Sequence, residues 1–197
     1  MTKEEQLAKL EAEAREELKV PGTNLVFGEG NPDARIMMIG EAPGFHEDRL
    51  GRPFVGQAGK VLDRMMDLAG IKRSDVYITN VLKTRPPGNR DPEPEEMEQA
   101  ARFLDGQIQI VDPEVVVTLG RFSMAKFMPG VKITQVHGVP KRVGRRVVVP
   151  MFHPAAALRA RAVMTLLEED FAKLPGILAN VDQVVGEGTD PNQLSLM

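Results

Sequence analysis

Residues 35–44 have the sequence RIMMIGEAPG, an apolar run that ends at Gly40 and is followed by polar and turn-forming residues. A short, uninterrupted apolar run bounded in this way is typical of a strand buried on both faces. Three later segments share this character, and they lie at residues 76–80, 115–119 and 146–150. The sequence therefore contains four short strands suited to the interior of a sheet.

Helical patterns separate these strands. Apolar residues recur at helical spacing between residues 58 and 69, and we expect further helices at residues 3–18, 95–111, 121–128 and 155–174. Strands that alternate with helices predict a parallel sheet covered on both sides. The expected fold class is therefore α/β: a three-layer αβα sandwich with a short, mostly parallel four-stranded central sheet.

The chain is expected to divide into three parts. Residues 1–24 would form an N-terminal helix and linker, residues 25–178 the main domain, and residues 179–197 a flexible, polar tail. The 197 residues are 42% hydrophobic and 27% charged, which excludes wholesale disorder. No apolar run is long enough to span a membrane, and the first residues, MTKEE, do not resemble a signal peptide. We therefore expect a cytoplasmic protein without a membrane partner. We also expect it to be a monomer.

Cysteine is absent, and there are three histidines. Disulfides, thiolate catalysis and cysteine-ligated metal sites are therefore excluded, and a His-rich metal site is not expected. We predict neither a metal nor a cofactor.

Charge is unevenly distributed along the chain, although the net charge is only -3. Between Arg121 and Leu167 there are nine basic residues and no acidic one; they are Arg121, Lys126, Lys132, Lys141, Arg142, Arg145, Arg146, Arg159 and Arg161. Such a cluster favours a face that contacts phosphates. The alternative is a solvated face on which basic residues gather by chance.

Polar residues follow the predicted strands. Because parallel strands bring their carboxyl ends to one edge, we expect a single cleft to collect Glu41, Asn80 and His153, with Phe54 nearby. These side chains suit a small, flat, polar ligand, since asparagine both donates and accepts hydrogen bonds and an imidazole can donate to an oxygen that becomes negative. Each of them also has an ordinary structural role as a cap, a turn residue or a core side chain.

Five blocks of sequence make the ligand more specific. They are VFGEGNPDA at 26–34, GEAPG at 40–44 with GRPFVGQAG at 51–59, TNVLK at 79–83 with RPPGNR at 85–90, TLGR at 118–121, and HPA at 153–155. Together they resemble the family 4 uracil-DNA glycosylases. The resemblance implies that residues 25–178 are a uracil-DNA glycosylase domain, a monofunctional N-glycosyl hydrolase of DNA base excision repair that flips uracil out of DNA and leaves an abasic site.

The resemblance implies two catalytic residues. His153, helped by the backbone of Gly40 and Ala42, would stabilise the charge that develops on the pyrimidine oxygens. Glu41 would position water or stabilise the cationic sugar. Family 1 relatives carry an aspartate base at the position of Ala42, so in this chain the neighbouring Glu41 is the candidate to handle the water.

Uracil itself would be recognised by three further side chains. Phe54 would stack on the ring, Asn80 would pair with its polar edge and reject cytosine, and Glu47 would exclude the methyl group of thymine. The segment AAALRAR at 155–161 resembles the loop that enters the duplex, with Leu158 as its wedge; the alternative is an ordinary helix start. The residues expected to bind DNA are Arg85, Arg121, Leu158, Arg159 and Arg161.

One feature of family 4 is missing. Its members usually hold a four-iron cluster on four cysteines, which would fall in Leu18–Thr23, at Thr84 and near Ala100 of this chain. We expect packing of the helix at 3–18, with ion pairs from Arg85 and Arg90, to hold this region instead.

The end of the chain carries a separate motif. Gln193, Leu194, Ser195, Leu196 and Met197 resemble the pentapeptide that binds the bacterial sliding clamp, with Met in place of the final aromatic residue. A mobile tail can dock into a groove, so a sliding clamp is a candidate partner and Gln193, Leu194, Leu196 and Met197 its contacts. The alternative is a disordered terminus.

The sequence is also compatible with other functions. The main alternative is a non-catalytic protein that binds uracil-containing or abasic DNA and is recruited by a sliding clamp. A metal-dependent nuclease using Glu41, Glu47 and Asp48 is another, and a flavodoxin-like module a third, although no Gly-rich phosphate loop follows the first strand. For the glycosylase, we expect association with the nucleoid.

Overall fold

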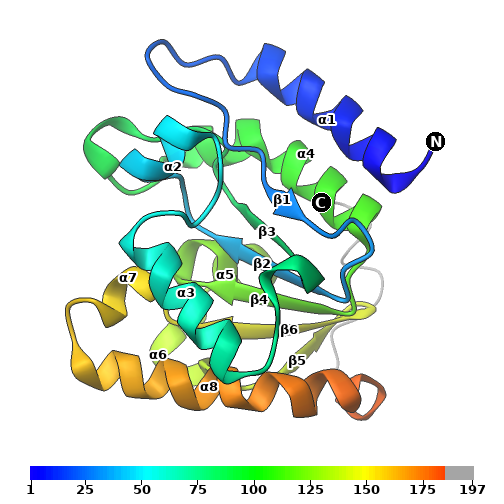
Figure 1. Ribbon diagram of the computed structural model, residues 1–197, viewed down its shortest axis with the longest axis vertical. Helices are drawn as coiled ribbons and strands as arrows, with labels where there is room; N and C mark the ends of the chain where they lie inside the picture. Colours follow the sequence, from blue (N-terminus) through cyan, green and yellow to red (C-terminus); the bar gives the residue numbers. More distant parts are fainter. Residues whose placement is uncertain (185–197) are drawn as a thin grey trace.

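The computed structural model describes residues 1–184 (Figure 1). Its sheet consists of β1 (Glu29–Gly30), β2 (Ile36–Gly40), β3 (Val76–Asn80), β4 (Val115–Leu119), β5 (Lys141–Val143) and β6 (Arg146–Met151), in the order β1-β3-β2-β4-β6-β5. The four inner strands are parallel, whereas β1 and β5 pair antiparallel at the edges. The inner strands are the four predicted ones, and β2, β3 and β4 are buried along their full length.

The prediction of a four-stranded sheet is wrong, because six strands are present. The two extra strands are short and lack an apolar run. β1 has only two residues; it follows Gly28 and ends at Gly30, both of which have positive φ. β5 has a basic sequence that leads into the turn at Gly144. Both owe their conformation to pairing with a buried neighbour, which local sequence does not show.

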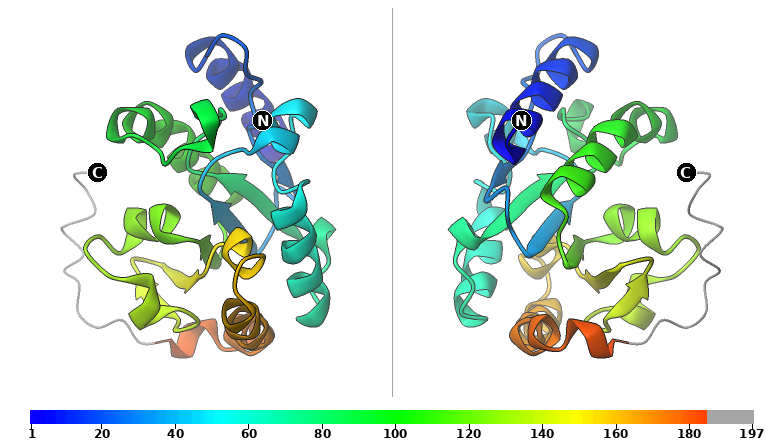
Figure 2. Two further views of the ribbon diagram at one scale, coloured as in Figure 1. Left: turned by 90° about the vertical axis from the view of Figure 1, so that its left-hand side faces the viewer. Right: turned by 90° about the vertical axis from the view of Figure 1, so that its right-hand side faces the viewer.

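Helices cover both faces of the sheet (Figures 1 and 2). One face packs against α3 (Gln57–Leu68), α7 (Pro154–Ala157) and α8 (Arg161–Ala179). The other packs against α1 (Lys3–Glu17), α4 (Pro94–Val111), α5 (Arg121–Phe127) and α6 (Ile133–Val136). The short α2 (Phe45–Leu50) follows β2, and three 3-10 turns, η1 (Arg73–Asp75), η2 (Pro87–Asn89) and η3 (Val181–Gln183), complete the fold. No helix within residues 1–184 is both long and apolar enough to cross a bilayer.

The helix predicted at 155–174 is two helices. α7 ends at Ala157 and α8 begins at Arg161, so that Leu158 lies in the corner between them. α8 then continues through Pro175 to Ala179. A proline inside a helix removes one hydrogen bond, but burial of Leu174 and Ile177 on either side holds this turn against the sheet.

The two ends of the described chain belong to the same folded body. Gly106 of α4 leaves room for Leu10 of α1, since a Cβ there would lie 2.6 Å from the Leu10 side chain. Arg102 of α4 pairs with Glu13 and Glu17 of α1. At the other end, Val181 is buried and its carbonyl accepts a hydrogen bond from Arg142, which connects the segment after α8 to β5.

Candidate active site

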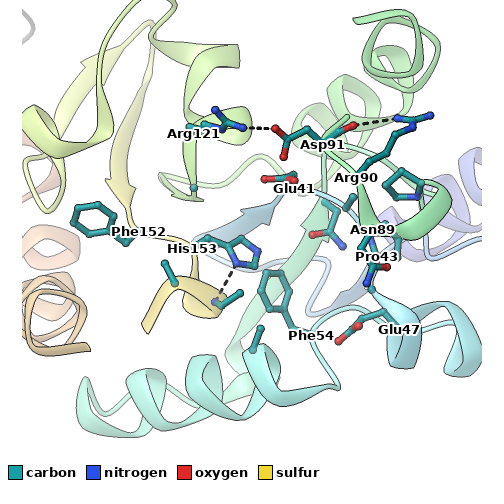
Figure 3. A pocket seen from close by; sticks show the side chains of 18 of the residues that line it. Glu41, Pro43, Glu47, Phe54, Asn89, Arg90, Asp91, Arg121, Phe152 and His153 are labelled. Carbon is teal, nitrogen blue, oxygen red and sulfur yellow. Dashed lines mark hydrogen bonds and ion pairs between the residues drawn. The ribbon is translucent and has the colours of Figure 1, made fainter. Parts of the chain in front are cut away.

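The carboxyl ends of the parallel strands open into a pocket of about 620 Å³ (Figure 3). Its wall is formed by segments that follow β2, β3, β4 and β6, as the parallel topology requires. Eight residues predicted to act on uracil or DNA line it; they are Glu41, Ala42, Glu47, Phe54, Asn80, Arg121, His153 and Arg159.

Asn80 lies at the floor of the pocket with an unused hydrogen-bonding atom. Its side chain is 2% exposed, and its Oδ1 has no hydrogen-bond partner within residues 1–184. Gly40 is its neighbour in the sheet, and a Cβ on Gly40 would lie 2.3 Å from Asn80 Oδ1 and 2.5 Å from the Phe54 ring. Gly40 is therefore the residue that lets the amide and the ring approach each other. A buried acceptor without a donor costs about 1–3 kcal/mol, which a ligand N–H would recover.

Phe54 is held in an uncommon backbone conformation. Its φ is 51°, in the left-handed region that non-glycine residues rarely adopt. Arg73 donates hydrogen bonds to the carbonyl oxygens of Pro53 (2.6 Å) and Phe54 (3.3 Å). The buried ring stacks with the imidazole of His153 at a centroid distance of 5.7 Å and an interplanar angle of 30°. This turn presents a flat apolar surface to the pocket.

His153 is fixed in one tautomer by the main chain. Its Nδ1 accepts a hydrogen bond from the N–H of Ala155 at 3.1 Å, so the ring proton resides on Nε2. Burial lowers the pKa of His153 to about 4, although Glu47 acts in the opposite direction. The imidazole is therefore neutral at pH 7 and offers a single N–H donor.

Glu47 lines the pocket and also accepts hydrogen bonds from the loop that follows Phe54. Its Oε1 accepts hydrogen bonds from the backbone N–H groups of Val55 (2.8 Å) and Gly56 (2.7 Å). The other oxygen, Oε2, is close to Gly44, where a Cβ would lie 2.8 Å away. Glu47 thereby connects α2 to the segment that carries Phe54, and both segments line the pocket.

Glu41 lies beneath an ion pair that spans the pocket mouth. Arg121, at the start of α5, pairs with Asp91 from the loop after η2 (Figure 3). Burial raises the pKa of Glu41, Asp91 adds to the rise, and Arg121 opposes it. Asp91 is a pocket residue that sequence reasoning missed. It follows directly on the RPPGNR block, and that adjacency was the only available signal.

A second missed residue lies behind the pocket floor. Lys83 is 1% exposed, and its Nζ donates to Asn80 O (2.7 Å), Thr79 Oγ1 (2.7 Å) and Gln107 Oε1 (2.6 Å). Burial lowers the pKa of the Lys83 ammonium well below its usual range. All its partners are neutral acceptors. Lys83 thus supports the strand end that carries Asn80.

Three predicted DNA-binding residues lie outside the pocket lining. Leu158 is 50% exposed in the corner between α7 and α8, Arg161 is exposed at the start of α8, and Arg85 donates to Asn89 Oδ1 at 2.6 Å. None of the three lines the pocket, although Pro86 and Arg159, which are close to them in sequence, do.

The basic segment does not form one face, contrary to expectation. Arg121 and Arg159 line the pocket. Arg145 and Arg146 instead pair with Asp112 at the end of α4, and Arg142 donates to Val181 O and Val184 O. Arg146 is the first residue of β6, whereas His153 follows the last residue of that strand. Arg145 and Arg146 therefore lie at the amino end of β6, away from the pocket at its carboxyl end. Basic residues that are close in sequence therefore lie far apart here, because the length of β6 separates Arg146 from the arginines that line the pocket.

The carboxylates proposed for a nuclease do not converge. Asp48 Oδ1 accepts from the N–H of Asn24 at 2.7 Å, and Glu47 is engaged with Val55 and Gly56. Within residues 1–184 no group of three His, Asp or Glu side chains is arranged to hold a metal ion.

The region expected for an iron–sulfur cluster offers no suitable ligands. Leu18, Val20, Thr23 and Thr84 line a second pocket of about 370 Å³, and none has a thiolate. The helix predicted at 3–18 is present as α1 and packs on α4, with Leu10 against Gly106. Of the two arginines predicted to form ion pairs here, Arg90 does so, with Glu93 and Glu96, whereas Arg85 bonds to the neutral Asn89. The ion pairs that reach α1 come from Arg102 instead.

Several known proteins are similar in sequence to this chain over most of its length. The model of the Uracil DNA glycosylase superfamily matches residues 27–174. The type-4 uracil-DNA glycosylase of Thermotoga maritima is 47% identical over 156 residues, covering 77% of this chain and 81% of that protein. The type-4 enzymes of Sulfurisphaera tokodaii and Archaeoglobus fulgidus are 48% and 46% identical over 162 residues, covering 77% of this chain in both cases and 74% and 81% of those proteins. The chain therefore belongs to the uracil-DNA glycosylase superfamily and, within it, to the type-4 uracil-DNA glycosylases.

Proposed function

We propose that this protein is a DNA repair glycosylase that hydrolyses the N-glycosidic bond of uracil and leaves an abasic site. The observation that carries the proposal is the unpartnered Oδ1 of Asn80 at the floor of the pocket. Uracil presents an N–H donor next to a carbonyl acceptor, which complements the oxygen and NH₂ of one amide. Cytosine presents an acceptor and an amino donor at these positions, so Asn80 would leave two groups unpaired against it.

Substrate binding uses the walls of the same pocket. The ring of Phe54 stacks on the flipped base, and Glu47 stands beside it, where it excludes the methyl group of thymine. Support comes from the fixed turn at Phe54 and from the hydrogen bonds that orient Glu47. The backbone of Gly40 and Ala42 completes the site on the side of β2.

The reaction separates charge. As the bond between uracil and C1′ breaks, its electron pair stays on the base and the sugar becomes cationic. The Nε2–H of neutral His153 donates a hydrogen bond to the pyrimidine oxygen that gains charge, a contribution worth about 2.7–4 kcal/mol for one such donor. Glu41 accepts a hydrogen bond from the water that attacks C1′ and stabilises the cation. As the new C–O bond forms, the water gives its proton to the Glu41 carboxylate, which releases it to solvent, and the uracil anion takes up a proton from solvent as it leaves.

The DNA strand follows the rim of the pocket. Leu158 enters the space left by the flipped base, while Arg85, Arg121, Arg159 and Arg161 contact phosphates. The exposure of Leu158 between α7 and α8 supports the wedge. The non-catalytic alternative is less favoured, since every side chain that the chemistry needs converges in one pocket.

A single-turnover assay tests the function. An oligonucleotide with one uracil is incubated with excess protein, with and without a chelator, and abasic sites are cleaved by alkali. We expect alkali-dependent, chelator-insensitive cleavage at the uracil. Binding of uracil-containing DNA without any cleavage would overturn the proposal in favour of a DNA-binding protein.

The remaining predictions concern the chain's organisation and partners. We also propose that the enzyme is a monomer and that it associates with the nucleoid. Its C-terminal residues would bind a sliding clamp, through Gln193, Leu194, Leu196 and Met197. These four residues lie outside the described residues, and the support for the clamp is the sequence motif alone. Loss of clamp binding on deletion of residues 193–197 would support it, and unchanged binding would refute it.

A further inference from the structure

An exposed aromatic side chain stands at the mouth of the pocket. Phe45 is the first residue of α2 and is 53% exposed. Gly44 before it and Glu47 in the same helix both line the pocket, so the ring lies at the rim. Burying a phenylalanine is normally favourable, but this one is left about half exposed, so part of its ring is available to a ligand.

A guanidinium group covers part of this ring. The Cζ atom of Arg85 lies 5.3 Å from the ring centroid, and His46 meets the ring edge-on at 5.5 Å and 82°. Arg85 Nε is oriented by Asn89 Oδ1 at 2.6 Å, and its neighbours Pro86 and Asn89 line the pocket. The terminal nitrogens of Arg85 make no hydrogen bond to another residue within residues 1–184. The pair thus offers an aromatic surface next to an available cation.

The acidic residues near this rim are already engaged. Asp48 accepts from Asn24, Glu47 from Val55 and Gly56, and Asp91 pairs with Arg121. Figure 1 places α2 and α7 at the same side of the molecule, beyond the ends of the strands. α7, whose Ala155 and Ala156 line the pocket, leads to the exposed Leu158, a second exposed apolar side chain close in sequence to the pocket lining.

We propose that Phe45 and Arg85 form a second nucleotide subsite, in which Phe45 stacks on the base next to the uracil in the same strand and Arg85 contacts that nucleotide's phosphate. The inference rests on the proposed function. Flipping one nucleotide leaves its neighbours without a stacking partner on one side, and an aromatic ring replaces that partner for any base. A base can reach the ring more easily when it is unpaired, so the subsite favours single-stranded or locally opened DNA.

The test compares two single-stranded substrates. One contains uracil between ordinary nucleotides, and in the other the nucleotides on both sides of the uracil are base-free tetrahydrofuran analogues. Affinity and single-turnover excision are measured for the wild type, Phe45→Ala and Phe45→Trp. We expect Phe45→Ala to lose about tenfold in affinity for the first substrate and little for the second, and Phe45→Trp to retain wild-type affinity.

Leu50→Ala is the matched control, because Leu50 lies in the same helix and is 60% exposed but does not line the pocket. It should change neither measurement. For Arg85→Gln, the dependence of affinity on salt should become less steep by about one phosphate contact. Equal effects of Phe45→Ala on both substrates, or no effect on either, would overturn the subsite even if the wild type excises uracil. Absence of excision by the wild type would instead refute the proposed function, and the affinities would still decide on the subsite.

Discussion

Lys83 Nζ lies 2.7 Å from the carbonyl oxygen of Asn80, and the rest of its hydrogen bonds go to the equally buried Thr79 and Gln107. The residue proposed to read uracil is therefore supported from behind by a lysine that never reaches the pocket surface. Gln107 extends the network to the carbonyl of Phe27 and to the hydroxyl of Tyr77. A network in which each member has partners can hold a strand end in a single arrangement.

Lys83→Met should lower uracil excision by acting through Asn80. The substitution keeps the length of the side chain but removes the donor to Asn80 O, Thr79 Oγ1 and Gln107 Oε1, and we expect a loss of about 1–3 kcal/mol in unfolding free energy. Single-turnover rates for Lys83→Met, Asn80→Ala and the double variant give the coupling. If Lys83 acts through Asn80, adding Lys83→Met to Asn80→Ala should cost almost nothing further. Independent, additive losses would mean that Lys83 only supports the fold.

Asn80→Ala should separate activity from stability. We expect excision of uracil to fall by about 10²-fold or more, because the polar edge of the base would lose its partner. The substitution also removes a buried oxygen that has no donor within the described chain, so the melting temperature should stay close to that of the wild type. Excision kinetics on uracil and cytosine, with thermal unfolding beside them, check both parts. Unchanged discrimination would contradict the reading role.

His153 should make the fold less stable in mild acid. Its pKa is about 4 when folded against an ordinary 6.5, so between these values the unfolded chain binds more protons. Stability contributed by neutral His153 is therefore present above pH 6.5 and is lost as the pH falls toward 4, by on the order of 3 kcal/mol. Unfolding by urea across this range should show the slope in the wild type and a shallower one in His153→Gln. The same slope in both proteins would place the titration elsewhere.

The acid limb of the pH–rate profile should belong to Glu41. Because its pKa is raised, the rate of the chemical step should fall as the pH drops through a value above 4.5. Asp91→Asn removes a negative neighbour and should move this limb to lower pH, whereas Arg121→Gln should move it to higher pH. Glu41→Gln should abolish it. Shifts of the two variants in the same direction would show that the limb reports another group.

The four inner strands and most helices could be predicted because their patterns are local. The run at Ile36–Gly40 is buried on both faces, and its sequence shows it. β1 and β5 could not be predicted, because their extended form comes from pairing with β3 and β6. The break at Leu158 could not be predicted either, since Ala and Leu suit a helix and no Gly or Pro marks the end of α7.

Most of the candidate site could be predicted because topology brings strand ends together. Glu41, Asn80 and His153 do meet in one pocket. Asp91 and Lys83 could not be assigned in advance. The position of Asp91 depends on how a proline-rich loop folds back toward Arg121, and a lysine in sequence gives no sign that it is buried. The prediction of one basic face was wrong, because a count of charges along the chain does not show at which end of a strand each basic residue lies.

The hydrogen bond from the Ala155 backbone to His153 has an evolutionary consequence. In many active sites a side chain orients the imidazole, and a single mutation can remove it. Here the orienting group is a peptide N–H, which every residue except proline supplies at position 155. The alanine can therefore be exchanged during sequence drift without loss of the tautomer, and Ala155→Pro is the substitution that should remove the orienting bond while His153 itself is retained.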